Sequence, residues 1–180
     1  MKIICLVGMP GAGKGEVNKI LESENIPTVV MSFVVRDEVK KRGLEPNIKN
    51  LDNVAVDLRK QFGKDVVAKR IAEKVKTINS NVVCVDGVRN IEEIDILKKV
   101  GDVTIVCIDA PEKMRFERLS KRGESRDPKN LGEFKWREQK QIGLGVDRVI
   151  EIADYKIVND DSLEDLEKKI KKLLADIGHV

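Results

Sequence analysis

Residues 3–16 read IICLVGMPGAGKGE, an apolar run followed by a glycine-rich turn that ends in a lysine and a glutamate. From Gly8 to Lys14 the turn matches G-x-x-x-x-G-K, between a predicted strand and a predicted helix. Glycines let successive backbone N–H groups converge on a phosphate, and the following helix adds the positive end of its dipole. The stretch therefore predicts a mononucleotide-binding loop, with Lys14 bridging the β- and γ-phosphates. The predicted ATP-binding residues are Gly8, Met9, Pro10, Gly11, Ala12, Gly13, Lys14 and Gly15.

The composition limits the class of protein. The chain has 180 residues, 41% hydrophobic and 36% charged, which suits one globular domain with a buried core. Its 34 Lys and Arg residues interleave with 31 Asp and Glu residues and form no basic stripe. The first apolar run is far shorter than the roughly 20 residues that span a membrane. We therefore expect a cytoplasmic protein that binds neither nucleic acid nor membrane.

Cysteine and histidine usage narrows the chemistry. Cys5, Cys84 and Cys107 lie in separate apolar runs without further ligands at metal-binding spacing. We expect buried reduced thiols and no zinc site. The only histidine is His179, next to the last residue, which excludes catalytic triads and histidine general bases. The chemistry must depend on Lys, Arg, Asp, Glu and the backbone.

Short runs rich in Val and Ile alternate with amphipathic stretches along the whole chain. The runs are continuous, which is typical of strands buried on both faces of a parallel sheet. This alternation predicts an α/β fold, a three-layer α/β/α sandwich with about five parallel strands, in a single domain over residues 1–180. The predicted strands are 2–7, 27–31, 82–86, 103–108 and 154–158. The predicted helices are 15–24, 34–42, 50–61, 64–78, 91–99, 111–121, 130–142 and 162–176.

Two segments are longer than the connections of such a sheet require. Residues 33–78 carry several helices between the second and third strands, and residues 122–130, RGESRDPKN, are polar and loop-like. Long additions above the carboxyl ends of strands usually carry function. We interpret them as a helical flap and a short lid, the lid covering about residues 119–130.

A second motif, VVCVDGVR at residues 82–89, contains an acidic residue, Asp86, and ends in a basic residue, Arg89. Asp86 closes a buried strand, a position from which a carboxylate holds Mg²⁺ directly or through water. Arg89 follows it and faces the same predicted cleft. A strand-end Asp also fits an ordinary turn, but the nearby phosphate loop favours the metal role.

Arginines in and beside the lid are candidates for catalysis. Arg115, Arg118 and Arg122 share one face of a predicted helix, so we expect three guanidiniums to point toward the lid. Phosphoryl transfer needs such cations because its transition state spreads negative charge over the transferred group. An ordinary solvated helix face is the alternative. The candidates are Arg118, Arg122 and Arg126, with Arg36 and Arg137 in addition.

The order of these motifs resembles that of the nucleoside monophosphate kinases. It runs GMPGAGKG, Ser32 to Arg36, VVCVDGVR, RFERLSKR and ADYKIVNDDSLEDL, over nearly the whole chain. Adenylate kinase and dephospho-CoA kinase are similar enzymes, and small archaeal adenylate-kinase-related P-loop proteins are more similar still. The resemblance implies the strand order 2-3-1-4-5, with both substrates above the carboxyl ends of the strands.

The resemblance also implies a role for each motif. ATP with Mg²⁺ would be the donor, and AMP or another nucleoside monophosphate the acceptor. The insertion at 33–78 would bind the acceptor, and the lid arginines Arg118 and Arg122 would close over the γ-phosphate. The stretch ADYKIVND would lie near the adenine of ATP. The acceptor-binding residues predicted in this way are Ser32, Arg36, Arg89 and Arg137.

Two positions depart from the family pattern. Glu16 stands where adenylate kinases have Thr, and its carboxylate is a candidate Mg²⁺ ligand through water or a favourable helix start. Phe33 stands where related flaps often place Asp. These departures support a second hypothesis, a nucleotide-binding regulator without turnover. A dephospho-CoA kinase and a slow ATPase are further alternatives.

Two aromatic residues leave the base-binding contacts open. We interpret Trp136 and Tyr155 as packing residues, with stacking on a base as the alternative.

Overall fold

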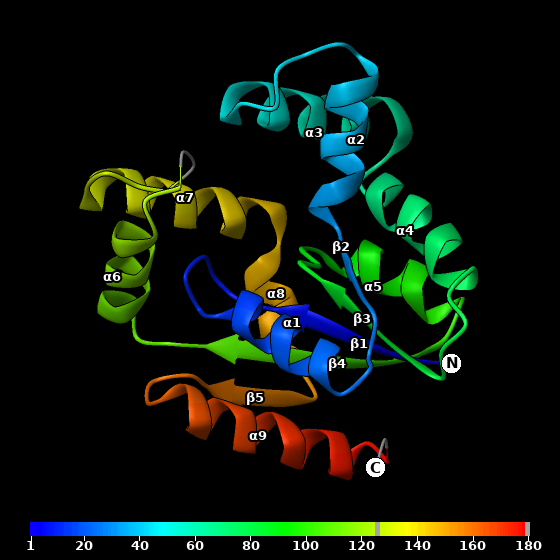
Figure 1. The fold of residues 1–180 in the computed structure, drawn as a ribbon. Helices are drawn as coiled ribbons and strands as arrows, with labels where there is room; N and C mark the ends of the chain where they lie inside the picture. The colour runs from blue at the N-terminus through cyan, green and yellow to red at the C-terminus, as the bar shows by residue number, and fades with distance from the viewer. Residues whose placement is uncertain (125–126, 179–180) are drawn as a thin grey trace.

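A computed structural model describes residues 1–124 and 127–178. In this part of the chain, five parallel strands form one sheet in the order β2-β3-β1-β4-β5 (Figure 1). The predicted α/β class, parallel direction and strand order are therefore confirmed. The strands are β1 (Lys2–Val7), β2 (Thr28–Val30), β3 (Val82–Asp86), β4 (Asp102–Asp109) and β5 (Tyr155–Val158).

Each predicted helix is present, with ends that differ by at most two residues. The sequence prediction missed only the short α8, which has six residues and follows Gly145. So short a helix shows too little periodicity to be recognised. The helices are α1 (Lys14–Ser23), α2 (Ser32–Lys41), α3 (Ile48–Phe62), α4 (Val66–Lys76), α5 (Ile91–Lys98), α6 (Glu112–Arg122), α7 (Leu131–Leu144), α8 (Val146–Glu151) and α9 (Leu163–Asp176).

Helices cover both faces of the sheet, which explains why the strands are apolar throughout. Successive residues of β1 alternate between two cores. Ile3, Cys5 and Val7 pack with residues of α2, α3, α4, α5 and α8. Ile4 and Leu6 pack with α1 and α9 on the opposite face, as Figure 1 shows. The three cysteines are free and buried, as predicted.

The register of the sheet fixes where the site forms. Leu6 on β1 is the Cα partner of Asp86 on β3. The loop that follows β1 therefore leaves the sheet next to Asp86, at the end of β3. The Gly87 amide donates to the Leu6 carbonyl at 3.0 Å and holds the two exits together. Beyond this edge, α2 and α3 stand on one side and α6 and α7 on the other (Figure 1).

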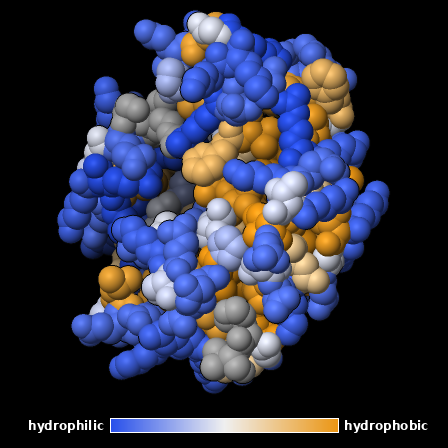
Figure 2. All heavy atoms as spheres, turned by 45° about the vertical axis from the view of Figure 1, so that its right-hand side comes forward, coloured by the Kyte–Doolittle hydropathy of each residue, from blue (hydrophilic) through white to orange (hydrophobic). Residues whose placement is uncertain are grey.

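The outer side, near α2 and α4, has a mixed surface. Figure 2 brings this side forward and shows apolar residues among mostly hydrophilic ones. A hollow of about 500 Å³ lies here, lined in part by Val29, Phe33, Val34 and Ile71. Within the described residues, no helix combines the length and the apolar character that crossing a membrane requires.

Candidate active site

The loop after β1 has the backbone of a phosphate-binding nest. Gly8, Gly11 and Gly13 have φ values of +155°, +83° and +103°. All three also lie close to other backbone or side-chain atoms; for example, a Cβ at Gly11 would lie 2.5 Å from the Arg115 carbonyl oxygen. A Cβ at Gly8 would lie 2.3 Å from the Ile108 carbonyl oxygen, and one at Gly13 would lie 2.1 Å from Asn159 Nδ2. Only glycine fits these positions, and the loop leads directly into α1 at Lys14.

Lys14 lies at the mouth of this loop. Its Nζ donates to the Gly8 carbonyl oxygen at 2.7 Å. Burial lowers the pKa of Lys14; the carboxylate of Asp86 opposes this effect, and the charge of Arg89 adds to it. A buried cation that lacks an anionic partner is costly, and a bound polyphosphate supplies that partner.

Asp86 has one occupied and one unpaired carboxylate oxygen. Its Oδ2 accepts a hydrogen bond of 2.8 Å from Asn18 Nδ2, one helical turn after Lys14 on α1. Its Oδ1 is buried and has no hydrogen-bond partner among the described residues. The sequence prediction identified Asp86 but missed Asn18, although its spacing of four from Lys14 places it on the same helix face.

This carboxylate fits the Mg²⁺ that the sequence resemblance implies. Mg²⁺ in such sites takes one or two carboxylates together with substrate phosphates and water, rather than an all-protein cage. Residues 1–124 and 127–178 contain no cluster of three or more acidic, His or Cys side chains that could hold a metal. Glu16 is paired with Lys19 at 2.9 Å, so its role as a ligand through water stays a prediction.

The three arginines of α6 do not share a target, so that prediction was wrong. Arg115 is buried and structural: its Nη1 lies 2.5 Å from Glu138 Oε1 on α7 and donates to the Pro10 carbonyl oxygen at 3.4 Å. The three guanidiniums diverge because their acceptors lie in different places, on α7, after β5 and in the segment after α6. Arg115 thereby joins α7 to the phosphate loop.

The other two arginines of α6 contact separate acceptors. Arg118 Nη2 donates to the Asn159 carbonyl oxygen at 3.0 Å, and its buried Nη1 has no partner among the described residues. Asn159 itself donates from Nδ2 to the Ala12 carbonyl oxygen at 2.9 Å, so Arg118 lies on the phosphate-loop side. Arg122 binds both oxygens of Asp127, at 2.8 and 2.5 Å. Arg126 lies outside the described residues.

Besides the hollow near α2 and α4, the structure has a second cavity, which lies between α3 and α7 and has a volume of about 550 Å³. Its lining residues recur every three or four positions on each helix, so one face of each helix borders it. The loop after β3 contributes Arg89, and the segment at 127–129 completes the wall. Helix α3 contributes Asp52, Ala55, Val56 and Arg59, and α7 contributes Glu133, Trp136, Arg137, Lys140, Gln141 and Leu144.

One buried carboxylate positions the arginines of this cavity. Glu93 is 0% exposed; its Oε1 lies 3.2 Å from Arg59 Nη2, and its Oε2 accepts 2.8 Å from the Arg89 amide. The Arg89 guanidinium has no hydrogen-bond or ion-pair partner within residues 1–124 and 127–178. Burial lowers the pKa of Arg89, and the neighbouring charge of Arg59 lowers it further. An anion bound here offsets that repulsion.

Comparison of the sequence with known proteins shows the family to which this chain belongs. A family model described as AAA domain matches residues 7–135. A UPF0200 protein from Hyperthermus butylicus is 42% identical over 96% of this chain and 93% of its own length. A second, from Thermococcus onnurineus, is 39% identical over 97% of both chains. The chain belongs to the UPF0200 family. These relatives are archaeal, as the sequence resemblance implied.

Solved structures agree on the fold of this UPF0200 protein. Protein TT1252 from Thermus thermophilus matches with a TM-score of 0.67 at 18% identity, over 97% of this chain and 96% of that one. Shikimate kinase from Acinetobacter baumannii, in complex with shikimate, matches with a TM-score of 0.62 at 19% identity, over 98% and 94%. The P-loop kinase fold is thereby confirmed, and it is consistent with a nucleotide-binding phosphotransferase.

The structure of this UPF0200 protein brings together only some of the predicted acceptor-binding residues. Arg89 and Arg137 both line the second cavity, where Arg137 also lies 3.3 Å from Asp127. Arg36 lies over the ring of Phe33, 5.7 Å from its centroid, and the cavity lining does not include it. Ser32 begins α2 and is likewise outside the lining. The acceptor roles of Arg36 and Ser32 stay predictions.

The sequence prediction named Arg137 on α7 and gave base stacking as the alternative for Trp136, but it missed Arg59, Glu93 and the other α7 residues that line the cavity. Asn90 and Glu93 carry a usable signal, because Asn90 Oδ1 caps α5 by accepting from the Glu93 amide at 2.8 Å. Trp136 is 58% exposed, so its interpretation as a packing residue was wrong. The residues of α7 that do face the core are Phe134 and Glu138.

Proposed function

We propose that this protein transfers the γ-phosphate of ATP to a small phosphate-bearing acceptor, with a nucleoside monophosphate such as AMP as the leading acceptor. The observation that carries the proposal is a pair of separate basic compartments. One is the phosphate loop with Lys14, and the other is the cavity that Arg89 enters. A plain ATPase requires only the first.

Each group has a defined part in the transfer. An oxygen of the acceptor forms a bond to the γ-phosphorus while the bond to the β–γ bridging oxygen breaks, and ADP leaves. Lys14 would hold the β- and γ-phosphates, and Asp86 would hold Mg²⁺, which neutralises phosphate charge when bound. Positioning and charge neutralisation dominate this reaction, so no dedicated general base is needed.

The lid arginines would stabilise the transferred group. The proposed catalytic residues are Arg118 and Arg122, together with Arg126 outside the described residues. Arg122 is bound to Asp127 in the present conformation, so it reaches a phosphate only after exchanging that carboxylate for the ligand. Lid closure would supply this exchange and exclude water.

The test is ADP formation from ATP with each common nucleoside monophosphate, with dephospho-CoA and without acceptor. We expect Arg89→Ala to raise KM for the acceptor about 10- to 100-fold, because a charge-assisted phosphate contact is lost. Its Kd for ATP should stay within about threefold. Arg148→Ala on α8 is the matched control, since Arg148 is exposed and outside the cavity lining.

Other outcomes select other functions. ADP formed only with dephospho-CoA would overturn the choice of a nucleoside monophosphate. ATP hydrolysis that no acceptor stimulates would indicate an ATPase, and tight nucleotide binding without turnover would indicate a regulator. Equal losses of ATP and acceptor affinity in Arg89→Ala would contradict the two-compartment assignment.

A further inference from the structure

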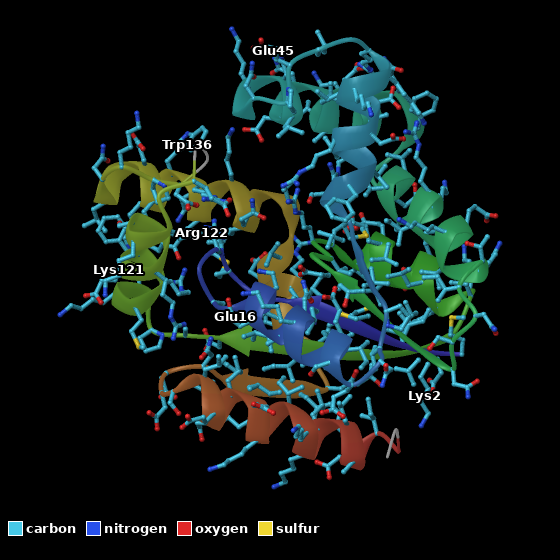
Figure 3. The ribbon with its side chains drawn as sticks, viewed as in Figure 1. Lys2, Glu16, Glu45, Lys121, Arg122 and Trp136 are labelled. Atoms are coloured by element: carbon cyan, nitrogen blue, oxygen red, sulfur yellow. The ribbon has the colours of Figure 1, made fainter. Side chains whose placement is uncertain are left out.

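The second cavity has an apolar wall that phosphate binding does not require. Trp136 and Val56 are both exposed large apolar residues, on α7 and α3, and both line it together with Leu144. In Figure 3, Trp136 stands on the side of α7 away from the sheet. The core contact of α7 is made by Phe134 instead. Packing within the fold therefore does not account for the Trp136 ring.

We propose that Trp136 is the stacking platform for the aromatic base of the acceptor, and that Arg59 and Arg89 together hold its phosphate. This inference rests on the proposed function, which places a phosphate-bearing acceptor in the cavity. It assigns recognition of the acceptor to α3 and α7, the two helices that face each other across the cavity. A nucleotide has the matching chemistry, a planar aromatic base that can stack at one end and a phosphate dianion at the other.

Arg59 is built into the cavity wall. Its side chain is largely buried, and Glu93 on one side and the Ala55 carbonyl oxygen on the other hold its two terminal nitrogens. Its Nε is buried without a hydrogen-bond partner among the described residues. A buried guanidinium donor needs an acceptor, and a phosphate oxygen supplies one.

The charges of the cavity favour an anion between the two arginines. Glu93 is the buried carboxylate beside both, yet it receives only the side chain of Arg59 and the backbone amide of Arg89. Within the described residues, the Arg89 side chain makes no hydrogen bond or ion pair, and the carboxylates of Glu93, Asp52 and Asp86 act on its charge without direct contact. A dianionic phosphate would neutralise the charges of the two guanidiniums, whereas a neutral ligand would leave their mutual repulsion in place.

Lys140 holds the Trp136 ring in place. Its Nζ lies 3.8 Å from the ring centroid and 2.9 Å from Asp52 Oδ2 on α3. This contact covers one face of the indole and fixes its orientation at low entropic cost. The cavity volume of about 550 Å³ falls within the roughly 300–1,000 Å³ usual for small-molecule sites.

The test uses Trp136 as its own reporter, because it is the only tryptophan in the chain. The full-length protein is titrated without ATP with AMP, GMP, CMP and UMP, and with ribose 5-phosphate, which has the phosphate but no base. We expect saturable quenching of tryptophan fluorescence by a nucleoside monophosphate. Ribose 5-phosphate should bind, as calorimetry detects, and leave the fluorescence nearly unchanged.

Variants separate the two halves of the proposed contact. By calorimetry and steady-state kinetics, Trp136→Leu should raise Kd and KM for the nucleotide about tenfold, with kcat within about twofold and ribose 5-phosphate binding unchanged. Arg59→Lys keeps a cation beside Glu93 but loses the planar fork, so it should weaken both ligands about tenfold. Phe62→Leu is the control, since Phe62 is 54% exposed on α3 and outside the cavity lining.

The outcomes distinguish this inference from the proposed function. Turnover with unchanged nucleotide affinity in Trp136→Leu overturns the stacking platform and leaves the kinase standing. Unchanged affinity in folded Arg59→Lys, checked by thermal denaturation, overturns its phosphate contact. Quenching by a nucleotide without turnover overturns the kinase and supports the site. Absence of nucleotide binding overturns both.

Discussion

Gly13, directly before Lys14, is a position of the phosphate loop that leaves no room for a side chain. Its backbone has a φ of +103°, and Asn159 Nδ2 occupies the space that a Cβ would need. Gly15, two residues later, has an ordinary backbone inside α1 and no atom within 4 Å of an added Cβ. The two glycines on either side of Lys14 look alike in the sequence, but only Gly13 is required by geometry.

Gly13→Ala and Gly15→Ala therefore form a matched pair. Gly13→Ala should lower the free energy of unfolding by about 2 kcal/mol or more and weaken ATP binding, because of backbone strain and the clash with Asn159. Gly15→Ala should be neutral or stabilise by up to about 1 kcal/mol, since it adds a better helix former. Urea denaturation and calorimetry with ATP measure both; equal effects of the two variants would contradict the loop geometry.

At the scale of the element, Asp127 joins the segment after α6 to two helices. Its side chain is 2% exposed and accepts from Arg122 on α6 and Arg137 on α7. Burial raises the pKa of Asp127, but the Arg122 bonds, with the Glu124 amide and Arg137, outweigh it and lower the pKa. A lowered folded-state pKa adds stability above the unfolded value of about 4, which is lost as pH falls through the folded value.

We expect Asp127→Asn to destabilise the protein by about 1–2 kcal/mol at pH 7, since the half-exposed Arg122 is partly screened by water. That corresponds to a fall in Tm of roughly 2–8 °C. The difference from the native protein should shrink as pH drops below about 4, because Asp127 takes up its proton first in the unfolded chain and in the native protein only at a lower pH. Calorimetric melts from pH 7 to pH 2 measure this. Glu73→Gln, in the exposed pair with Lys76, is the control. A difference in Tm that stays constant to pH 2 would argue against the assignment.

At the scale of the whole molecule, the register of the sheet sets the relation between the two compartments. Leu6 pairs with Asp86, so the phosphate loop and the loop carrying Arg89 begin at the same edge. The cavity between α3 and α7 includes Arg89 in its lining. The proposed donor and acceptor sites therefore open above neighbouring strands, as transfer between two bound substrates requires.

A linked ligand tests this relation directly. Two adenosines joined by a polyphosphate chain long enough to reach both compartments should bind one to one, about a hundredfold or more tighter than AMP alone. The gain arises because the second contact becomes intramolecular. Calorimetry and competition with ATP and with AMP measure it, and Arg89→Ala should remove most of the gain. Two bound molecules per chain, or no competition with AMP, would refute a shared opening.

The secondary structure and the local motifs of this chain could be predicted from its sequence, but most side-chain partners could not. The strands and the long helices followed from periodicity, and Lys14 and Asp86 followed from local motifs. The partners of the arginines did not, because the carboxylate that meets Arg115 comes from α7, and no periodicity indicates that the loop after α6 turns Asp127 back to Arg122. Trp136 was misinterpreted because a large aromatic residue ordinarily packs inside, and only the rotation of α7 shows that this one does not.

The buried ion pair of Arg115 and Glu138 links the helix beside one compartment to the loop that forms the other. Glu138 belongs to α7, which borders the proposed acceptor cavity, and Arg115 also donates to Pro10 of the phosphate loop. Separating such a pair would leave a charge stranded away from water, which is strongly unfavourable. We therefore expect α6 and the phosphate loop to shift together with α7 when a ligand draws α7 inward, so binding in one compartment would change the shape of the other.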